Sequence, residues 1–152
     1  TVAMNEFCGR VIAFEPDPVH YECLVKNCPE DVETHQLAIG NEEKMISLSD
    51  DDFTQAKRVV GNGTIPMVTI DSLNLEDIDL IKIDVEGYEM EVLKGAENTL
   101  ASVDYLMIEL NNNSKKYGSS NLEIEKHLRK SGYEILIKVW PDVVWRKKDK
   151  RK

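Results

Sequence analysis

Three short apolar runs in this sequence end in acidic residues. Glu15 follows RVIAF, Asp84 follows LIKI with Glu86 shortly after it, and Glu109 lies in LMIEL. Burying a carboxylate is costly unless it is paired or hydrogen-bonded, so the core alone gives no reason for these acids. In an open parallel sheet, ligands bind beyond the carboxyl ends of the strands. If the three runs are strands, the acids predict a ligand site.

Glu15 has two interpretations. A carboxylate at the end of the second strand of a nucleotide-binding fold can accept hydrogen bonds from both hydroxyls of a ribose. The same side chain could instead stabilise the start of the helix that begins at Asp17, where the helix dipole favours negative charge. The residues alone leave both interpretations open.

The elements that would position these acids alternate between strand and helix. The predicted strands are 10–16, 32–39, 45–48, 67–70, 79–84 and 105–110, and the predicted helices are 18–27, 88–100 and 122–130. Residues 49–64 are polar and glycine-containing, which predicts a loop. The end of the chain, 133–139 and 143–147, predicts two strands of a hairpin. Together these elements indicate an α/β sheet that is parallel except near its edge.

Length and composition indicate one domain. The chain has 152 residues, 41% of them hydrophobic, which suits a single core over 1–148 followed by a basic tail at 149–152. Its formal net charge of -9 argues against general nucleic-acid binding, because neutralising phosphates needs a basic surface. The sequence has neither a stretch of roughly 20 apolar residues nor the layout of a secretion signal. We therefore expect a cytoplasmic protein without a membrane span.

Four segments of the chain resemble one enzyme family. IAFEPDP, VTIDSL, LIKIDVEGYEMEVLKGAENTL and LMIEL, in this order and spacing, resemble the FkbM family of S-adenosylmethionine-dependent methyltransferases. The resemblance covers about residues 9–110, and KIDVEGYE with the trailing VLKGA is its most specific part. It implies the class I methyltransferase fold, a Rossmann-like and mostly parallel sheet with a C-terminal antiparallel hairpin. Many members resemble O-methyltransferases of sugar or polyketide hydroxyls, which implies a small-molecule acceptor.

The resemblance also implies roles for individual residues. Glu15 becomes the ribose ligand, residues 36–38 lie near the adenine, and residues 84–86 face the methyl-transfer centre. The residues expected to bind the cofactor are Glu15, Pro16, Gln36, Ala38 and Asp84.

Methyl transfer itself constrains the acids. It is an in-line displacement in which a nucleophilic oxygen attacks the sulfonium methyl group, so the protein must align the acceptor and remove its proton. Asp84 or Glu86 could be the general base, and Glu109 could hold an acceptor hydroxyl or assist. The three acids could instead bind a Mg²⁺ ion that lowers the pKa of the acceptor. We favour the reaction without a metal ion. We predict that the loops at 49–64 and 111–121 determine which acceptor is bound.

One part of the family pattern is absent from the printed sequence. The first strand and its glycine-containing turn, usually DxGAN, would precede Thr1, and the strand would lie between those ending in Glu15 and Asp84. We therefore expect an N-terminally truncated chain with reduced or no activity of its own. The alternative is a non-catalytic, methyltransferase-like binding module. A dinucleotide-dependent oxidoreductase would share the acid after the second strand but leaves KIDVEGYE unexplained.

Three further residues have competing interpretations. Lys82, inside an apolar strand, could pair with an acid such as Glu109 or Asp71, or take part in chemistry. Trp140 and Trp145 flank the terminal hairpin, and we predict that both pack rather than stack on a substrate.

Overall fold

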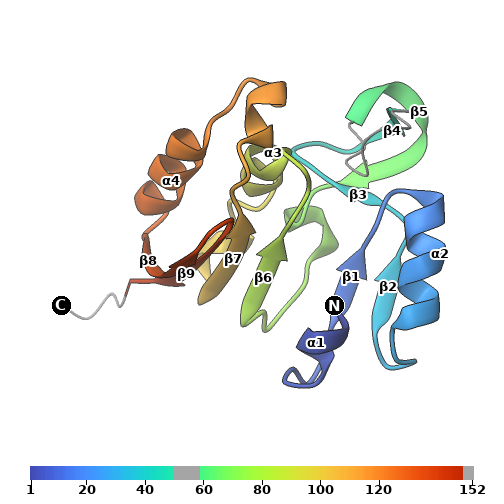
Figure 1. The fold of residues 1–152 in the computed structure, drawn as a ribbon, viewed down its shortest axis with the longest axis horizontal. Helices are drawn as coiled ribbons and strands as arrows, with labels where there is room; N and C mark the ends of the chain where they lie inside the picture. The colour runs from blue at the N-terminus through green and yellow to red at the C-terminus, as the bar shows by residue number, and fades with distance from the viewer. Residues whose placement is uncertain (50–58, 149–152) are drawn as a thin grey trace. The chain divides into compact units, whose positions relative to one another are not determined.

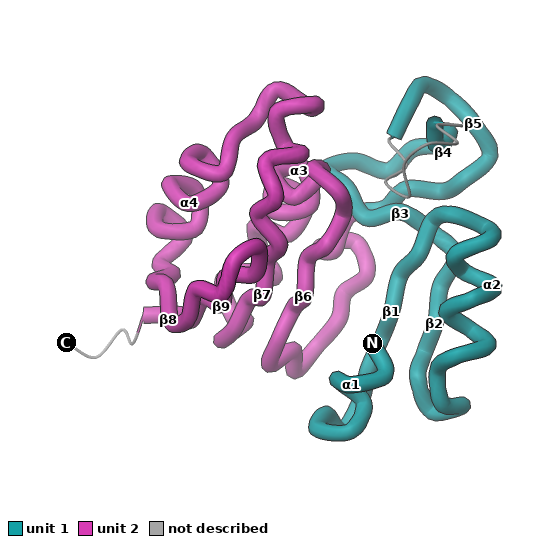
Figure 2. The backbone as a smooth tube through the Cα atoms, viewed as in Figure 1, with its two compact units in different colours: residues 1–68 teal, residues 69–152 magenta. Residues whose placement is uncertain are grey.

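The computed structural model describes residues 1–49 and 59–148 (Figure 1). They form two compact units, residues 1–68 and 69–152 (Figure 2). One domain over 1–148 stays a prediction, and the basic tail at 149–152 lies outside the described residues. In the described part of the chain, no helix combines the length and the apolar character needed to cross a membrane.

Unit 1 holds two small sheets. Its elements are α1 (Val2–Asn5), β1 (Ile12–Phe14), α2 (Pro18–Asn27), β2 (Glu33–His35), β3 (Ala38–Ile39), β4 (Lys44–Leu48) and β5 (Val59–Val68). Strands β1 and β2 pair in parallel, whereas β5 lies between β3, its parallel partner, and β4, its antiparallel partner. Helix α2 begins as predicted, because the Asp17 carboxylate accepts hydrogen bonds from the N–H groups of Val19 and His20. Pro18 occupies its first turn.

Two predictions in unit 1 are wrong in detail. The single strand predicted at 32–39 is two strands, β2 and β3, because β2 pairs with β1 while β3 pairs with β5 in the other sheet. The loop predicted at 49–64 lies partly outside the described residues, and 59–64 belong to β5. At Gly63 a Cβ atom would collide with the backbone of Ile46 on β4. The glycine that indicated a loop therefore allows two strands to approach closely.

Unit 2 holds one sheet of four strands and two helices. Its elements are η1 (Asp71–Leu73), β6 (Leu80–Ile83), α3 (Glu89–Lys94), η2 (Thr99–Ala101), β7 (Tyr105–Glu109), η3 (Asn113–Tyr117), α4 (Asn121–Lys130), β8 (Tyr133–Val139) and β9 (Asp142–Lys147). The strand order is β6-β7-β9-β8, with β6 and β7 parallel and β9 antiparallel to both neighbours. The predicted terminal hairpin is therefore correct.

The core of unit 2 lies where its sheet meets its helices. Alternate residues of β7 and β9 are fully buried, and so are apolar residues of α3 and α4; the set includes Leu93, Leu106, Ile108, Ile124, Leu128, Val143 and Trp145. The helix predicted at 88–100 is shorter than expected. It ends at Gly95, and the Asp71 carboxylate then accepts hydrogen bonds from the N–H groups of Asn98 and Thr99, which starts η2 instead.

Candidate active site

Three of the predicted acids meet at one edge of the sheet in unit 2. Strands β6 and β7 are parallel, so their carboxyl ends lie at the same edge, with Asp84 just after β6 and Glu109 at the end of β7. One carboxylate oxygen from each of Asp84, Glu86 and Glu109 lies within 4.8 Å of the others. The structure thus brings together the residues that the sequence assigned to catalysis.

A sharp turn after β6 positions Glu86. Glu86 has a φ of 52° and Gly87 a φ of 111°, the left-handed region that side chains other than glycine rarely adopt. Glu86 is held there by the side-chain amide of Asn113, which donates to its carboxylate at 2.9 Å, and by that of Asn111 at 3.3 Å. At Gly87 a Cβ atom would lie 2.6 Å from the carbonyl carbon and oxygen of Asn113. Only glycine therefore allows the two loops to touch here.

Glu109 and Asp84 have opposite pKa shifts. A hydrogen bond with Asp84, burial, and the negative charges of Asp84, Glu86 and Asp142 together raise the pKa of Glu109 to about 7. Burial also acts to raise the pKa of Asp84, but hydrogen bonds with Glu109 and Lys82 outweigh it and lower that pKa. Two acids in contact cannot both ionise easily. Near neutral pH, Asp84 therefore carries the charge and Glu109 is partly protonated.

Lys82 pairs with Asp84, not with Glu109 or Asp71. Its Nζ atom lies 2.6 Å from the Asp84 carboxylate, and Asp71 instead holds the start of η2. The strand explains this choice, because side chains two residues apart along β6 point to the same face. Lys82 thus helps to keep Asp84 ionised.

Sequence reasoning missed a fourth acid beside the cluster. Glu89 is only 2% exposed, and its carboxylate accepts a hydrogen bond from the Gly87 N–H at 2.8 Å. Burial raises its pKa, and the charges of Glu86 and Asp84 act in the same direction. In the sequence, Glu89 lies in a charged helical stretch, a pattern that indicates a solvent-facing turn rather than a buried acid. Asn111 and Asn113 were likewise predicted only as part of a variable loop.

Four of the five residues predicted to bind the cofactor lie in unit 1, and the fifth, Asp84, lies in unit 2. Glu15 follows β1 and Gln36 follows β2, so these parallel strands bring both residues to one edge of their sheet. The Glu15 carboxylate accepts a hydrogen bond from the Asp17 N–H at 2.8 Å, while Asp17 itself caps α2. Pro16 is half-buried, Gln36 is exposed, and Ala38 is buried in β3.

A second feature of unit 1 lies beside this edge. A cavity of about 490 Å³ is lined by the start of α2 and by β4 and β5; the lining residues are Asp17, Pro18, Ile46, Ser47, Leu48, Ser49, Val60, Thr64 and Ile65. Asp17 links this cavity to Glu15, because its N–H group donates a hydrogen bond to the Glu15 carboxylate.

Comparison with known proteins identifies the family. Residues 2–135 match the methyltransferase FkbM domain. The chain belongs to this family. The resemblance carried by KIDVEGYE and its neighbouring segments is thus confirmed, and the acid-bearing turn after β6 is part of an FkbM domain.

Individual relatives agree with this assignment. The chain is 30% identical to the hexuronic acid methyltransferase AglP of Haloferax volcanii in an alignment of length 116 that covers 67% of this chain and 47% of the relative. It is 25% identical to Methyltransferase 1 of Beauveria bassiana in an alignment of length 152 that covers 77% of this chain and 61% of the relative. The chain thus spans about half to three fifths of the length of these relatives.

A solved structure shows the same fold. The crystal structure of methyltransferase FkbM from Methylobacillus flagellatus superposes with a TM-score of 0.63 at 19% identity, covering 90% of this chain and 36% of that one. The predicted fold class, an α/β fold of the class I methyltransferase type, is confirmed.

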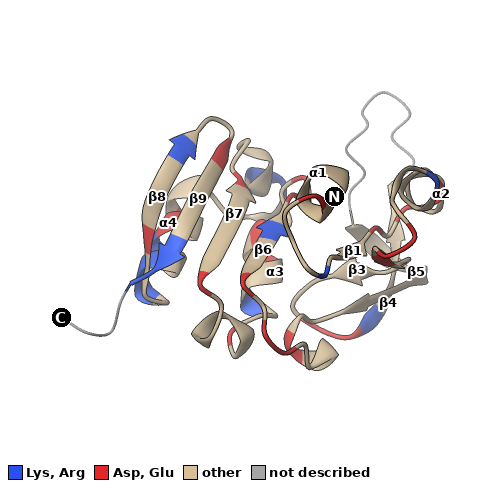
Figure 3. Ribbon diagram, turned by 90° about the horizontal axis from the view of Figure 1, so that it is seen from below, with Lys and Arg blue, Asp and Glu red and all other residues tan. Residues whose placement is uncertain are grey.

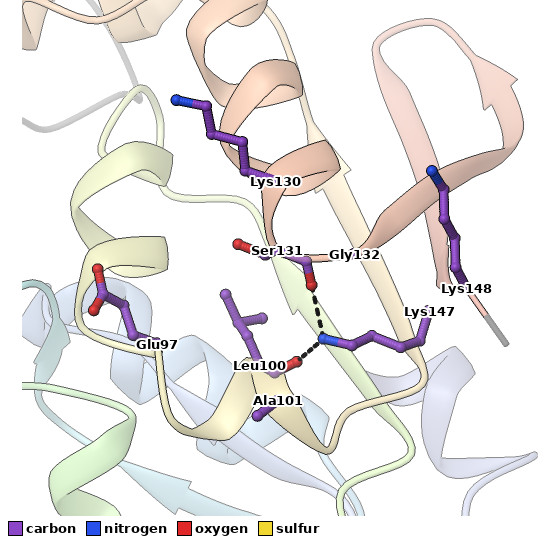
Figure 4. A pocket seen from close by; sticks show the side chains of 8 residues that line it. All are labelled: Glu97, Leu100, Ala101, Lys130, Ser131, Gly132, Lys147 and Lys148. Atoms are coloured by element: carbon purple, nitrogen blue, oxygen red, sulfur yellow. Dashed lines mark hydrogen bonds between the residues drawn. The ribbon is translucent and has the colours of Figure 1, made fainter. Parts of the chain in front are cut away.

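A further cavity (Figure 4) lies in unit 2 where β9 ends, at the end of the β7–β9 pair away from Glu109. Its volume is about 460 Å³, and its lining residues are Glu97, Leu100, Ala101, Lys130, Ser131, Gly132, Lys147 and Lys148. Basic residues gather there, where β9 ends (Figure 3). The Lys147 ammonium donates to the carbonyls of Leu100 at 2.6 Å and Ser131 at 2.8 Å, and lies 4.5 Å from the centre of the Tyr133 ring. Lys147 therefore joins three elements of the fold, and no predicted site residue lines this cavity.

Proposed function

We propose that this protein transfers a methyl group from S-adenosylmethionine to a hydroxyl oxygen of a small acceptor such as a sugar or polyketide. The observation that carries the proposal is the contact of Asp84, Glu86 and Glu109 at the carboxyl ends of two parallel strands. Membership of the FkbM family supports the methyl transfer. A relative named for hexuronic acid supports the sugar acceptor.

The cofactor roles follow from the ends of the strands. We assign the ribose hydroxyls to the Glu15 carboxylate, which the Asp17 N–H already orients. Pro16, Gln36 and Ala38 would contact the adenosine, and Asp84 would face the methionine portion. When bound, S-adenosylmethionine would supply a sulfonium methyl group as the electrophile. An ionised Asp84 favours such a cation nearby.

The proton acceptor is best assigned to the Asp84–Glu109 pair. The sequence suggested Asp84 or Glu86 as the base, but the lowered pKa of Asp84 makes it a weak base, and two amides engage Glu86. A general base works best when its pKa is near the operating pH, and the pKa of Glu109 is about 7. S-adenosylmethionine would supply the methyl group, and Glu109 in its ionised form would accept the proton of the acceptor hydroxyl.

The same carboxylates could in principle hold a metal. Three oxygens at this spacing are ligands that suit Mg²⁺. We propose the metal-free reaction, because Lys82, Asn113 and the shared proton of the Asp84–Glu109 pair already compensate the carboxylates. Loss of turnover on treatment with a chelator, restored by Mg²⁺ alone, would overturn this choice.

Cofactor binding is the first test. Titration calorimetry with S-adenosylmethionine is made on the chain as printed and on the product of its entire coding region, with Glu15→Gln as the variant expected to weaken binding. If the printed chain binds as tightly as the longer product, the expectation that it needs a preceding strand is wrong. If neither binds, the non-catalytic module replaces the enzyme as the conclusion.

Turnover is the second test. Radiolabelled methyl transfer is measured with hexuronic acids, neutral hexosides and a hydroxylated macrolactone as acceptors. Asp84→Asn should abolish turnover, because it removes the charge beside the reacting centre and disrupts the pair with Glu109; cofactor binding should weaken but remain measurable. Retained turnover in this variant would exclude the assigned role of the pair.

A further inference from the structure

The two tryptophans of the chain lie in opposite environments. Trp145 is fully buried at 0% exposure, whereas Trp140, in the turn between β8 and β9, is 60% exposed. The prediction that both pack is therefore wrong for Trp140. The turn explains the difference, because Trp145 lies within β9 under α4, beside Arg129, and Trp140 lies beyond the end of the ladder. An indole this exposed can bury a large apolar area when it contacts a ligand.

Backbone pairing places the Trp140 turn beside the acid cluster. In the antiparallel pair of β7 and β9, Glu109 lies opposite Asp142. Just beyond this pair, the N–H of Leu110, which follows β7, donates to the carbonyl of Pro141, which precedes β9, at 2.9 Å. The turn that carries Trp140 is thus hydrogen-bonded to the segment that continues from Glu109 to Asn111.

This edge of unit 2 therefore combines two kinds of binding group. Glu109, Asp142 and Asn111 offer carboxylate and amide groups that accept or donate hydrogen bonds, and Asn111 already contacts Glu109 at 3.4 Å. The turn that carries the exposed Trp140 indole is hydrogen-bonded through its backbone to the residue after Glu109. A ligand that matches both has hydroxyls on its rim and an apolar C–H face. A pyranose ring has this chemistry, whereas an extended aliphatic chain lacks the hydroxyls.

We propose that Trp140 is the stacking surface of the acceptor site and that it selects a pyranose sugar as the acceptor. This inference rests on the proposed function, since it names the acceptor class of the same site. The ring would lie against the indole, and the hydroxyl to be methylated would point toward Glu109. Trp140 would act on binding and alignment, and the proton would still pass to the acid pair.

Fluorescence tests the contact without turnover. Because Trp145 is buried, acrylamide quenching of the wild-type protein reports mainly on Trp140. Methyl α-glucopyranoside and glucuronic acid are the probes, and we expect at least one of them to protect the indole from quenching. Titration calorimetry with the same sugars should show weakened binding in Trp140→Ala and largely retained binding in Trp140→Phe.

Kinetics then separates stacking from catalysis. With the sugar that is methylated, Trp140→Ala should raise KM about five- to tenfold with little change in kcat, the scale of a lost aromatic contact. Trp140→Phe should restore most of the affinity. Tyr105→Ala is the matched control, because it removes an exposed aromatic side chain at the other end of β7, and it should leave KM unchanged.

The outcomes distinguish this inference from the proposed function. An unchanged KM in Trp140→Ala, or methyl transfer only to acceptors without a sugar ring, would overturn the stacking role and leave the methyltransferase intact. If the wild-type protein transfers methyl groups to no acceptor, the proposed function fails. In that case acrylamide quenching tests sugar binding independently of turnover. If neither sugar protects Trp140 from quenching, the proposed sugar binding at Trp140 is overturned as well.

Discussion

The two ends of strand β7 differ in how the charges of their ionisable side chains are compensated. At the carboxyl end, Glu109 faces the like charges of Asp84, Glu86 and Asp142, and its pKa rises to about 7. At the other end, the Lys147 ammonium is bound by two backbone carbonyls. A charge with full partners stabilises the fold, whereas acids gathered together cost stability and keep a proton exchangeable. Both ends are rich in ionisable groups, and this difference supports our proposal that the carboxyl end serves the chemistry.

Among variants that test this difference between the two ends of β7, Glu109→Gln should have the largest effect. We expect turnover to fall by about 100-fold or more, the usual scale for losing a general base, because glutamine keeps the shape but cannot accept the proton. Cofactor binding should not change. Urea unfolding should show no loss of stability, since the variant removes a repelled charge; a clear loss would mean that the carboxylate is structural.

Gly87→Ala should damage the fold at the acidic end. The left-handed φ and the collision with the Asn113 backbone together should cost about 2–4 kcal/mol of unfolding free energy. Gly118→Ala is the matched control, because Gly118 also has a positive φ but open space around it. A similar loss in both variants would show that the backbone angle alone matters and that the contact between the loops does not.

Lys147→Met should damage the fold at the basic end and leave the chemistry unaffected. Losing the hydrogen bonds to the Leu100 and Ser131 carbonyls should lower the unfolding free energy by about 1.5–3 kcal/mol, with kcat per folded molecule unchanged. Lys148→Met, at the exposed neighbouring position, should change stability by about 0.5 kcal/mol or less. Equal effects of the two variants would contradict the structural role of Lys147.

The smallest effect is a pH dependence of stability. The pKa of Glu109 is raised from 4.5 to about 7 in the folded protein, so the folded state holds a proton that the unfolded chain has released. Stability should therefore fall as the pH rises from about 4.5 to about 7. Glu109→Gln should lack this component of the pH profile when unfolding is followed by urea titration, and identical profiles would refute the raised pKa.

Much of this arrangement was predictable because it depends on local sequence. Asp17 and Pro18 correctly predict the start of α2. The apolar runs that end in acids correctly predict that Asp84 and Glu109 lie together. Non-local pairing was harder to foresee. No residue in the local sequence marks the break between β2 and β3. Gly63 indicates a turn from the sequence, and only the structure shows that it allows the close approach of β4.

The missed site residues have the same cause. Glu89 is buried only because the turn at Gly87 folds its N–H group toward that carboxylate. Asn111 and Asn113 acquire a role only when two loops, far apart in the sequence, come into contact. Residue types and spacing identify the acids, whereas the groups that orient them depend on the complete fold.

The contact between Gly87 and Asn113 also constrains how this domain can diversify. The loop after β7 supplies the amides that hold Glu86, so the segment assigned to acceptor choice also sets the geometry of the acids. A new acceptor preference gained by replacing residues 111–113 would therefore change reactivity at the same time. Residues 115–119 supply neither amide, but Tyr117 in this range packs edge-on against Tyr88, beside Gly87, with ring centres 4.9 Å apart. If this loop sets acceptor choice as we propose, a change of specificity is therefore tied to the geometry of the acids.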